Sequence, residues 1–105
     1  MAEKISFEFN GTPITLEFSR NTIRTMEQAG FDIDELGSKP TVRIPQLFQG
    51  AFLLHHRRMD QNTINTIWNR MKRKTELVEK LQSMYYETVS TLMDEPEDDE
   101  KNIDW

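Results

Sequence analysis

A chain of 105 residues without cysteine can fold around one core, but it can form neither disulfides nor thiolate metal sites. Its formal net charge of −5 is unevenly spread, with −2 on residues 1–54, +4 on residues 55–80 and −7 on residues 81–105. No run approaches the ~20 apolar residues of a bilayer span, and the N-terminus does not resemble a signal peptide, so the sequence predicts a soluble, cytoplasmic protein with no membrane partner.

Residues 4–18 predict a β-hairpin. Apolar and polar residues alternate on both sides of Asn10-Gly11, the preferred pair for a two-residue type I′ turn. Closing the chain on this turn places Phe7 opposite Ile14 and gathers the apolar side chains on one face. The other expected pairs are Ile5 with Leu16, Glu8 with Pro13 and Phe9 with Thr12. An isolated hairpin is marginal in water, so helices must cover this face.

A short helix is predicted to follow the hairpin. Ser19 can cap it, and its inner side carries Ile23 and Met26. Gly30 suits the position after the helix end, where it would let Phe31 fold back on Met26 in a Schellman-type stop. Residues 32–36 could then form one short turn.

The next helix is predicted to begin at Pro45, because proline is favoured at the first helical position. Residues 40–45 are expected to be extended. This should be the most buried helix, since its apolar stripe is wide. The stripe consists of Leu47, Phe48, Ala51, Phe52 and His55.

Two more helices are predicted after Asp60 or Asn62. The apolar series breaks at Lys74 and Thr75, so we expect Thr75 to cap a last helix over residues 76–93. A continuous helix over residues 61–93 is the alternative, because the heptad phase is unbroken.

These elements predict an α+β fold in which an N-terminal antiparallel β-hairpin packs against a bundle of three to four α-helices. Residues 1–93 should form a single domain. Residues 94–105 are dense in acids and contain Pro96, which predicts a disordered acidic tail.

No catalytic motif is evident, so the sequence predicts a protein that is not an enzyme and takes no cofactor or metal. It contains neither a phosphate-binding glycine loop nor a nucleophile motif. Its two histidines, His55 and His56, are neighbours about 100° apart on a helix and cannot readily chelate one ion together. We expect His55 to be packed in the core.

A basic segment offers a possible nucleic-acid contact. It comprises Arg57, Arg58, Arg70, Lys72, Arg73 and Lys74. The chain as a whole is acidic, however, and cations near helix C-termini are favourable on dipole grounds alone. Nucleic acid is therefore disfavoured as a partner.

Several large apolar residues exceed what a core needs and are candidates for partner binding. Leu53 and Leu54 directly follow Phe52, so one of them must point away from the buried side. Trp105 stands among acids, as in a short docking motif, although it could also pack back on its own domain. The complete candidate set is Phe48, Phe52, Leu53, Leu54, Trp68, Tyr86 and Trp105.

The order of several short motifs resembles the small tail assembly chaperones of long-tailed phages and prophages. The motifs are F-x-F-x-G at residues 7–11, L-E-F-S-R at 16–20, M-E-x-x-G-F at 26–31 and P-x-L-F-x-G-A-F at 45–52, followed by M-Y at 84–85. The resemblance covers roughly residues 5–93.

This resemblance implies a chaperone that binds the apolar, helix-rich tape measure protein and helps to recruit tail-tube subunits. Such a protein acts in the cytoplasm of the bacterial host and is absent from the finished virion. The family has no catalytic residues to transfer. Either hairpin strand could also pair edge to edge, so we expect a homo-oligomer. The alternatives are a structural tail-completion or connector protein and, less favoured, a small nucleic-acid-binding regulator.

Overall fold

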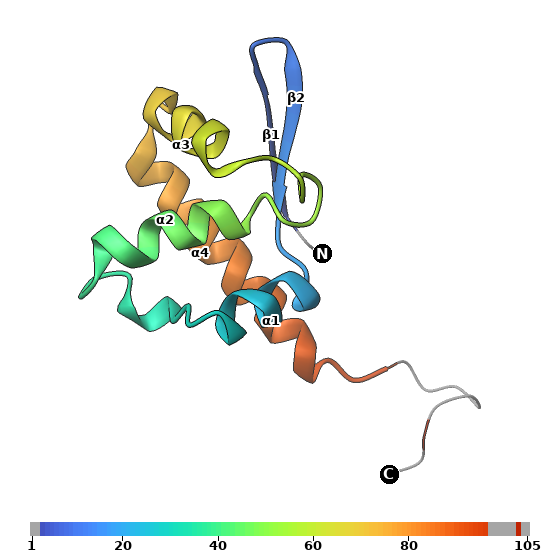
Figure 1. Ribbon diagram of the computed structural model, residues 1–105. Coiled ribbons are helices and arrows are strands. Elements are labelled where there is room, and N and C mark those ends of the chain that lie inside the picture. Colours follow the sequence, from blue (N-terminus) through green and yellow to red (C-terminus); the bar gives the residue numbers. More distant parts are fainter. Residues whose placement is uncertain (1–2, 97–102, 104–105) are drawn as a thin grey trace.

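The computed structural model describes residues 3–96 and 103 and confirms the predicted α+β fold (Figure 1). A two-stranded antiparallel hairpin precedes four α-helices and two short 3-10 turns. The elements are β1 (Lys4–Phe9), β2 (Thr12–Glu17), α1 (Arg20–Gln28), η1 (Ile33–Glu35), α2 (Pro40–Gly50), α3 (Gln61–Arg70), α4 (Lys74–Ser90) and η2 (Thr91–Met93). Most of the predicted tail, including Trp105, lies outside the described residues, so its disorder stays a prediction.

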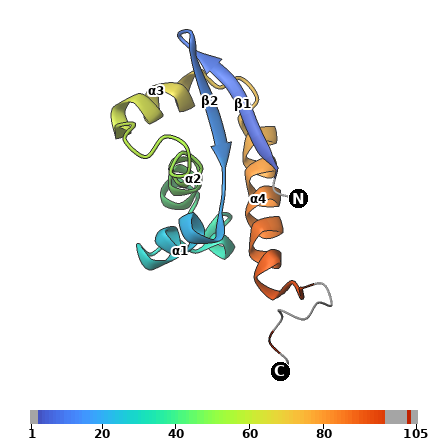
Figure 2. The ribbon, with the colours of Figure 1, turned by 90° about the vertical axis from the view of Figure 1, so that its right-hand side faces the viewer.

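The hairpin has the predicted register and turn. Phe7 pairs with Ile14, and Glu8 pairs with Pro13. Asn10 and Gly11 both have positive φ, 51° and 81°, as a type I′ turn requires. Figure 2 shows β1 on the side of α4 and β2 on the side of α2 and α3.

Helix α1 begins and ends as predicted. The Ser19 side chain accepts a hydrogen bond from the Thr22 amide, and the Thr22 hydroxyl accepts one from the Ser19 amide. At the other end, Gly30 has φ 103°, a conformation that glycine adopts without a steric penalty. The amide of Phe31 then donates to the carbonyl of Met26 at 3.0 Å, which is the long hydrogen bond of a Schellman motif.

The predicted bounds of α2 are wrong at both ends. The helix begins at Pro40, not Pro45, and Pro45 lies inside it. Either proline could occupy the first position of a helix, where proline is favoured. Only Pro40 does so. Inside the helix, Pro45 cannot donate to the carbonyl four residues earlier; that carbonyl belongs to the exposed Thr41, where water can replace the missing donor. The helix ends at Gly50, and residues 51–55 form turns instead of continuing the helix to His55.

The break before α4 is confirmed, so the alternative of one helix over residues 61–93 is wrong. Asp60 caps α3 by accepting from the Thr63 amide at 2.8 Å. Met71 ends α3 with an extended backbone. Thr75 does not cap α4, because α4 starts at Lys74 without a side-chain cap.

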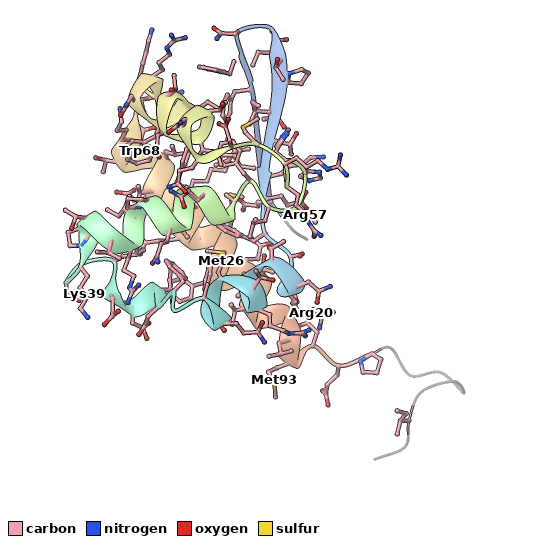
Figure 3. The ribbon with its side chains drawn as sticks, viewed as in Figure 1. Arg20, Met26, Lys39, Arg57, Trp68 and Met93 are labelled. Carbon is pink, nitrogen blue, oxygen red and sulfur yellow. The ribbon has the colours of Figure 1, made fainter. Side chains whose placement is uncertain are left out.

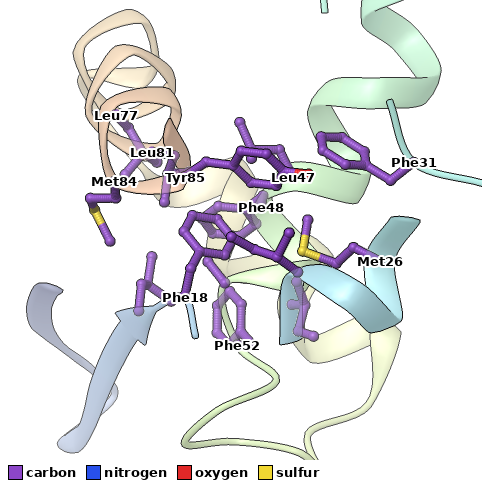
Figure 4. Close-up of a cluster of buried hydrophobic side chains, with 14 of the residues drawn as sticks. Phe18, Met26, Phe31, Leu47, Phe48, Phe52, Leu77, Leu81, Met84 and Tyr85 are labelled. Carbon is purple, nitrogen blue, oxygen red and sulfur yellow. The ribbon is translucent and has the colours of Figure 1, made fainter. Parts of the chain in front are cut away.

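Helix α4 forms one side of the core (Figure 4). Its Leu81, Met84 and Tyr85 meet Phe18 from the end of the hairpin. The rings of Phe18 and Phe31 each pack edge-on to Tyr85, with centroids 5.6 Å apart in both pairs. This core fixes the short helix α1 between α2 and α4.

Candidate protein-binding surface

Helix α1 is flanked by two shallow apolar grooves, one toward α2 and one toward α4. It has nine residues, whereas α4 has 17. The C-terminal end of α4 and the following η2 therefore carry apolar residues that α1 does not fully cover. Figure 3 places Arg20 and Met93 at this end of the molecule and Trp68 at the other end.

The α1–α2 groove has a volume of about 240 Å³. Gly50 allows the two helices to approach closely here, because a Cβ at this position would collide with the side chain of Met26. Leu53 lies half-buried beside it. The lining residues are Thr25, Met26, Ala29, Phe31, Gln46, Gln49, Gly50 and Leu53.

The α1–α4 groove has a volume of about 190 Å³ and lies next to exposed apolar residues of α4 and η2. Val89 and Leu92, which line it, are 37% and 64% exposed, and the adjacent Met93 is 82% exposed. Its other lining residues are Arg20, Ile23, Arg24 and Glu27. The groove therefore combines apolar side chains with two cations and one carboxylate.

Tyr85 connects the core to the rim of this second groove. Its hydroxyl donates to Oε2 of Glu27 at 2.7 Å. Burial of the ring, and then the hydrogen bond to this carboxylate, raise the pKa of Tyr85 well above its ordinary value. The hydroxyl therefore stays protonated near neutral pH and acts as a donor that positions Glu27 on α1.

The predicted partner-binding residues do not form one surface. Phe48 and Phe52 are buried in the core and present no surface to a partner. Trp68 is half-buried, with its ring centroid 5.0 Å from that of Phe48. Of the adjacent pair, Leu53 lines the α1–α2 groove and Leu54 is exposed.

Tyr86 is exposed on α4, where its hydroxyl lies 3.4 Å from Oδ1 of Asp34. Trp105 lies outside the described residues.

The sequence analysis missed Val89, Leu92 and Met93 as surface candidates. The last predicted helix, over residues 76–93, carries an apolar stripe that continues to Leu92. One signal was available, because the predicted partner helix before Gly30 is much shorter than that stripe. The end of a long stripe facing a short helix cannot be covered by it.

The prediction of a buried His55 is wrong. Its side chain is 40% exposed, and its Nε2 lies 2.7 Å from Oε1 of Glu17. The helix expected to carry it ends at Gly50, so the buried stripe, which reaches Phe52, does not continue to His55. His56 instead accepts the Thr15 amide at its Nε2, at 2.9 Å. No three metal-ligating side chains cluster anywhere in residues 3–96 or 103.

Arg70 and Lys74, two residues of the basic segment, make contacts within the fold. Arg70 lies over the ring of Phe9, 5.2 Å from its centroid. Lys74 donates to the carbonyl of Met71 at 2.7 Å and stands 5.7 Å from the Trp68 ring centroid. These contacts support a structural role at the junction of α3 and α4.

The structure thus describes a small α+β protein in which several exposed apolar residues lie at the end of α4 and on η2, beside α1. No helix in the part of the chain described here is both long and apolar enough to span a bilayer. The whole chain, residues 1–105, matches the family described as a domain of unknown function, DUF5055, and the chain belongs to that family. Comparisons with curated proteins and with solved structures found no match.

Proposed function

We propose that this protein is a phage or prophage tail assembly chaperone that binds the tape measure protein. The observation that carries the proposal is where the resembling motifs lie in the fold. Met26 and Phe31 are the first and last residues of the M-E-x-x-G-F motif, and Gly50 belongs to the P-x-L-F-x-G-A-F motif. All three residues line the α1–α2 groove. Residues of two separate motifs thus meet at one apolar groove.

The chemistry of this surface suits an amphipathic helix as the client. A helix docks into a groove through apolar side chains spaced at i, i+3, i+4 and i+7. The accessible apolar side chains are Leu53 in the α1–α2 groove and Val89 and Leu92 in the α1–α4 groove. Met26, Phe31 and Ile23 also line the grooves but are largely buried. Exposed Arg20 and Arg24 beside the second groove favour a client with carboxylates next to its apolar stripe.

Each groove is small, so a single copy should bind weakly. A long client with many similar helical segments can be covered by many copies, and multivalency then raises the overall avidity. The protein would act in the cytoplasm during tail assembly, recruit tail-tube subunits, and leave before the virion is complete. Mass spectrometry of purified virions tests the last point, because a structural tail component would remain there.

Co-expression with the tape measure protein encoded by the same phage tests the proposal. The wild-type chain should keep that protein in the soluble fraction. Leu53→Asp and Leu92→Asp each place a charge in one groove and should return much of it to the pellet. Val42→Asp is the matched control, because Val42 is 50% exposed and lines neither groove. A client that precipitates equally with and without the wild-type chain would refute the proposal.

A further inference from the structure

Strand β1 has one edge bonded to β2 and one open edge. In a two-residue hairpin the pair next to the turn is hydrogen-bonded, and the pairs then alternate. The backbone groups of Lys4, Ser6 and Glu8 therefore point away from β2. Among the described residues these groups have no hydrogen-bond partner.

The outer edge of β2 is closed by contrast. Pro13 has no amide hydrogen to donate. The amide of Thr15 donates to Nε2 of His56 at 2.9 Å, and the amide of Glu17 donates to the carbonyl of Ala51 at 3.1 Å. The sequence analysis named both hairpin strands as candidates for edge-to-edge pairing. In the structure, only β1 has an open edge among the described residues.

The apolar face of the hairpin is also less covered at β1. On β2, Ile14 and Leu16 are 1% and 0% exposed. Their cross-strand neighbours Phe7 and Ile5 point to the same face but are only half-buried. Beside β1 lies a groove of about 520 Å³ between the strand and the start of α4. It is lined by Lys4, Ile5, Ser6, Phe7, Met71, Lys72, Arg73, Glu76, Leu77 and Lys80.

We propose that the β1 edge of a second copy of this chain pairs antiparallel with β1, around a two-fold axis at Ser6. This register places Lys4 opposite Glu8 of the second copy, and Glu8 opposite Lys4 of the second copy. It also places Ile5 opposite Phe7 of the second copy on the apolar face. Both copies then satisfy their outward backbone groups and cover the exposed sides of these residues.

The charges favour this register over its neighbours. Residues whose backbone groups point outward must lie opposite each other across the two β1 strands. The two nearest alternative registers therefore pair Lys4 of one copy with Ser6 or with Asn10 of the second copy. Either shift removes both opposite-charge pairs, which contribute measurably when they lie directly across a sheet. The edge is thus complementary to itself, as a two-fold interface requires. This inference is independent of the proposed function, since none of these residues lines the grooves beside α1.

Charge reversal with mixing tests the pairing. In sedimentation equilibrium, the wild-type chain should dimerise with rising concentration. Lys4→Glu alone and Glu8→Lys alone should each weaken dimerisation by roughly tenfold or more, because two attractive pairs become repulsive. An equimolar mixture of the two variants should recover wild-type association, since every cross-strand pair is then attractive again.

Ser6→Pro provides a second test that does not depend on charge. It removes the outward amide at the two-fold axis, and Pro13 shows that the same hairpin accepts proline at an outward position. Its melting temperature should stay close to wild type while the dimer is lost. A wild-type chain that stays monomeric throughout, or variants that dimerise like wild type, would overturn the proposal. Association strengthened by Glu8→Lys would also overturn it, because the edge would then bind an acidic segment such as residues 94–105.

Discussion

Replacing Tyr85 by phenylalanine tests how the core is connected to α1. The substitution keeps the edge-on packing against Phe18 and Phe31 and removes only the hydroxyl that donates to Glu27 at 2.7 Å. A hydrogen bond to a charged group contributes ~1.5–3 kcal/mol, and the lower end applies because Glu27 is exposed and its carboxylate keeps water contacts. We therefore expect a loss of about 1–1.5 kcal/mol in the free energy of unfolding.

Urea unfolding at neutral pH measures this loss, and a double-mutant cycle with Glu27→Ala assigns it to the pair. The two single losses should not add, because each removes the same hydrogen bond. The melting temperature of Tyr85→Phe should fall by roughly 5–8 °C. A variant as stable as wild type, with no coupling to Glu27→Ala, would refute the reasoning.

The pH dependence of the same pair has a definite sign. The folded protein holds the pKa of Tyr85 above its ordinary value, which is about 10 in an unfolded chain. Above that pH the unfolded state binds fewer protons than the folded state, so stability falls as pH rises. The advantage of wild type over Tyr85→Phe should therefore shrink above about pH 10. A gap that stays constant up to pH 11 would contradict the assigned cause.

Three further substitutions, one of them with a matched control, test local features of the fold. Gly30→Ala should lower the free energy of unfolding by roughly 1 kcal/mol, because φ is 103° at this position. Gly37→Ala is its control and should be nearly neutral, because φ is not positive there and no atom crowds the site. Chemical unfolding compares the two variants. Pro45→Ala should raise the melting temperature, because it restores an amide donor inside α2, and a lower value would contradict the account of that helix. Hydrogen bonds from Arg43, and then Lys39, hold the pKa of Glu35 below its ordinary value. Wild type should therefore lose stability relative to Glu35→Gln as pH falls below about 4.3. If acid titrations show equal losses of stability in wild type and Glu35→Gln, the result would count against this ion pair.

Local signals predicted the parts of the fold that depend on local geometry. Asn10-Gly11 fixed the hairpin register because a two-residue type I′ turn and the apolar alternation agree on one pairing. Ser19 and Gly30 marked both ends of α1 because caps are decided within a few residues.

Features that depend on tertiary contacts could not be read in this way. Pro40 and Pro45 both suit a helix start, and only the packing of α2 decides between them. His55 turned outward because α2 ends at Gly50, where the chain turns back so that the Glu17 amide meets the Ala51 carbonyl. The grooves beside α1 likewise follow from how the helices lie together. The sequence indicates only that a short helix cannot cover the whole apolar stripe of the last helix.

Site-specific photo-crosslinking in cells that express the tail genes tests the proposed function most directly. A photoreactive residue is placed at Leu53 or Leu92 in the two grooves, and at Val42 as the control on the same fold. Adducts with the tape measure protein should form from Leu53 and Leu92 and be absent or much weaker from Val42. If the groove positions give no adduct with that protein, or no more than Val42 gives, the client does not bind beside α1 and the account is wrong.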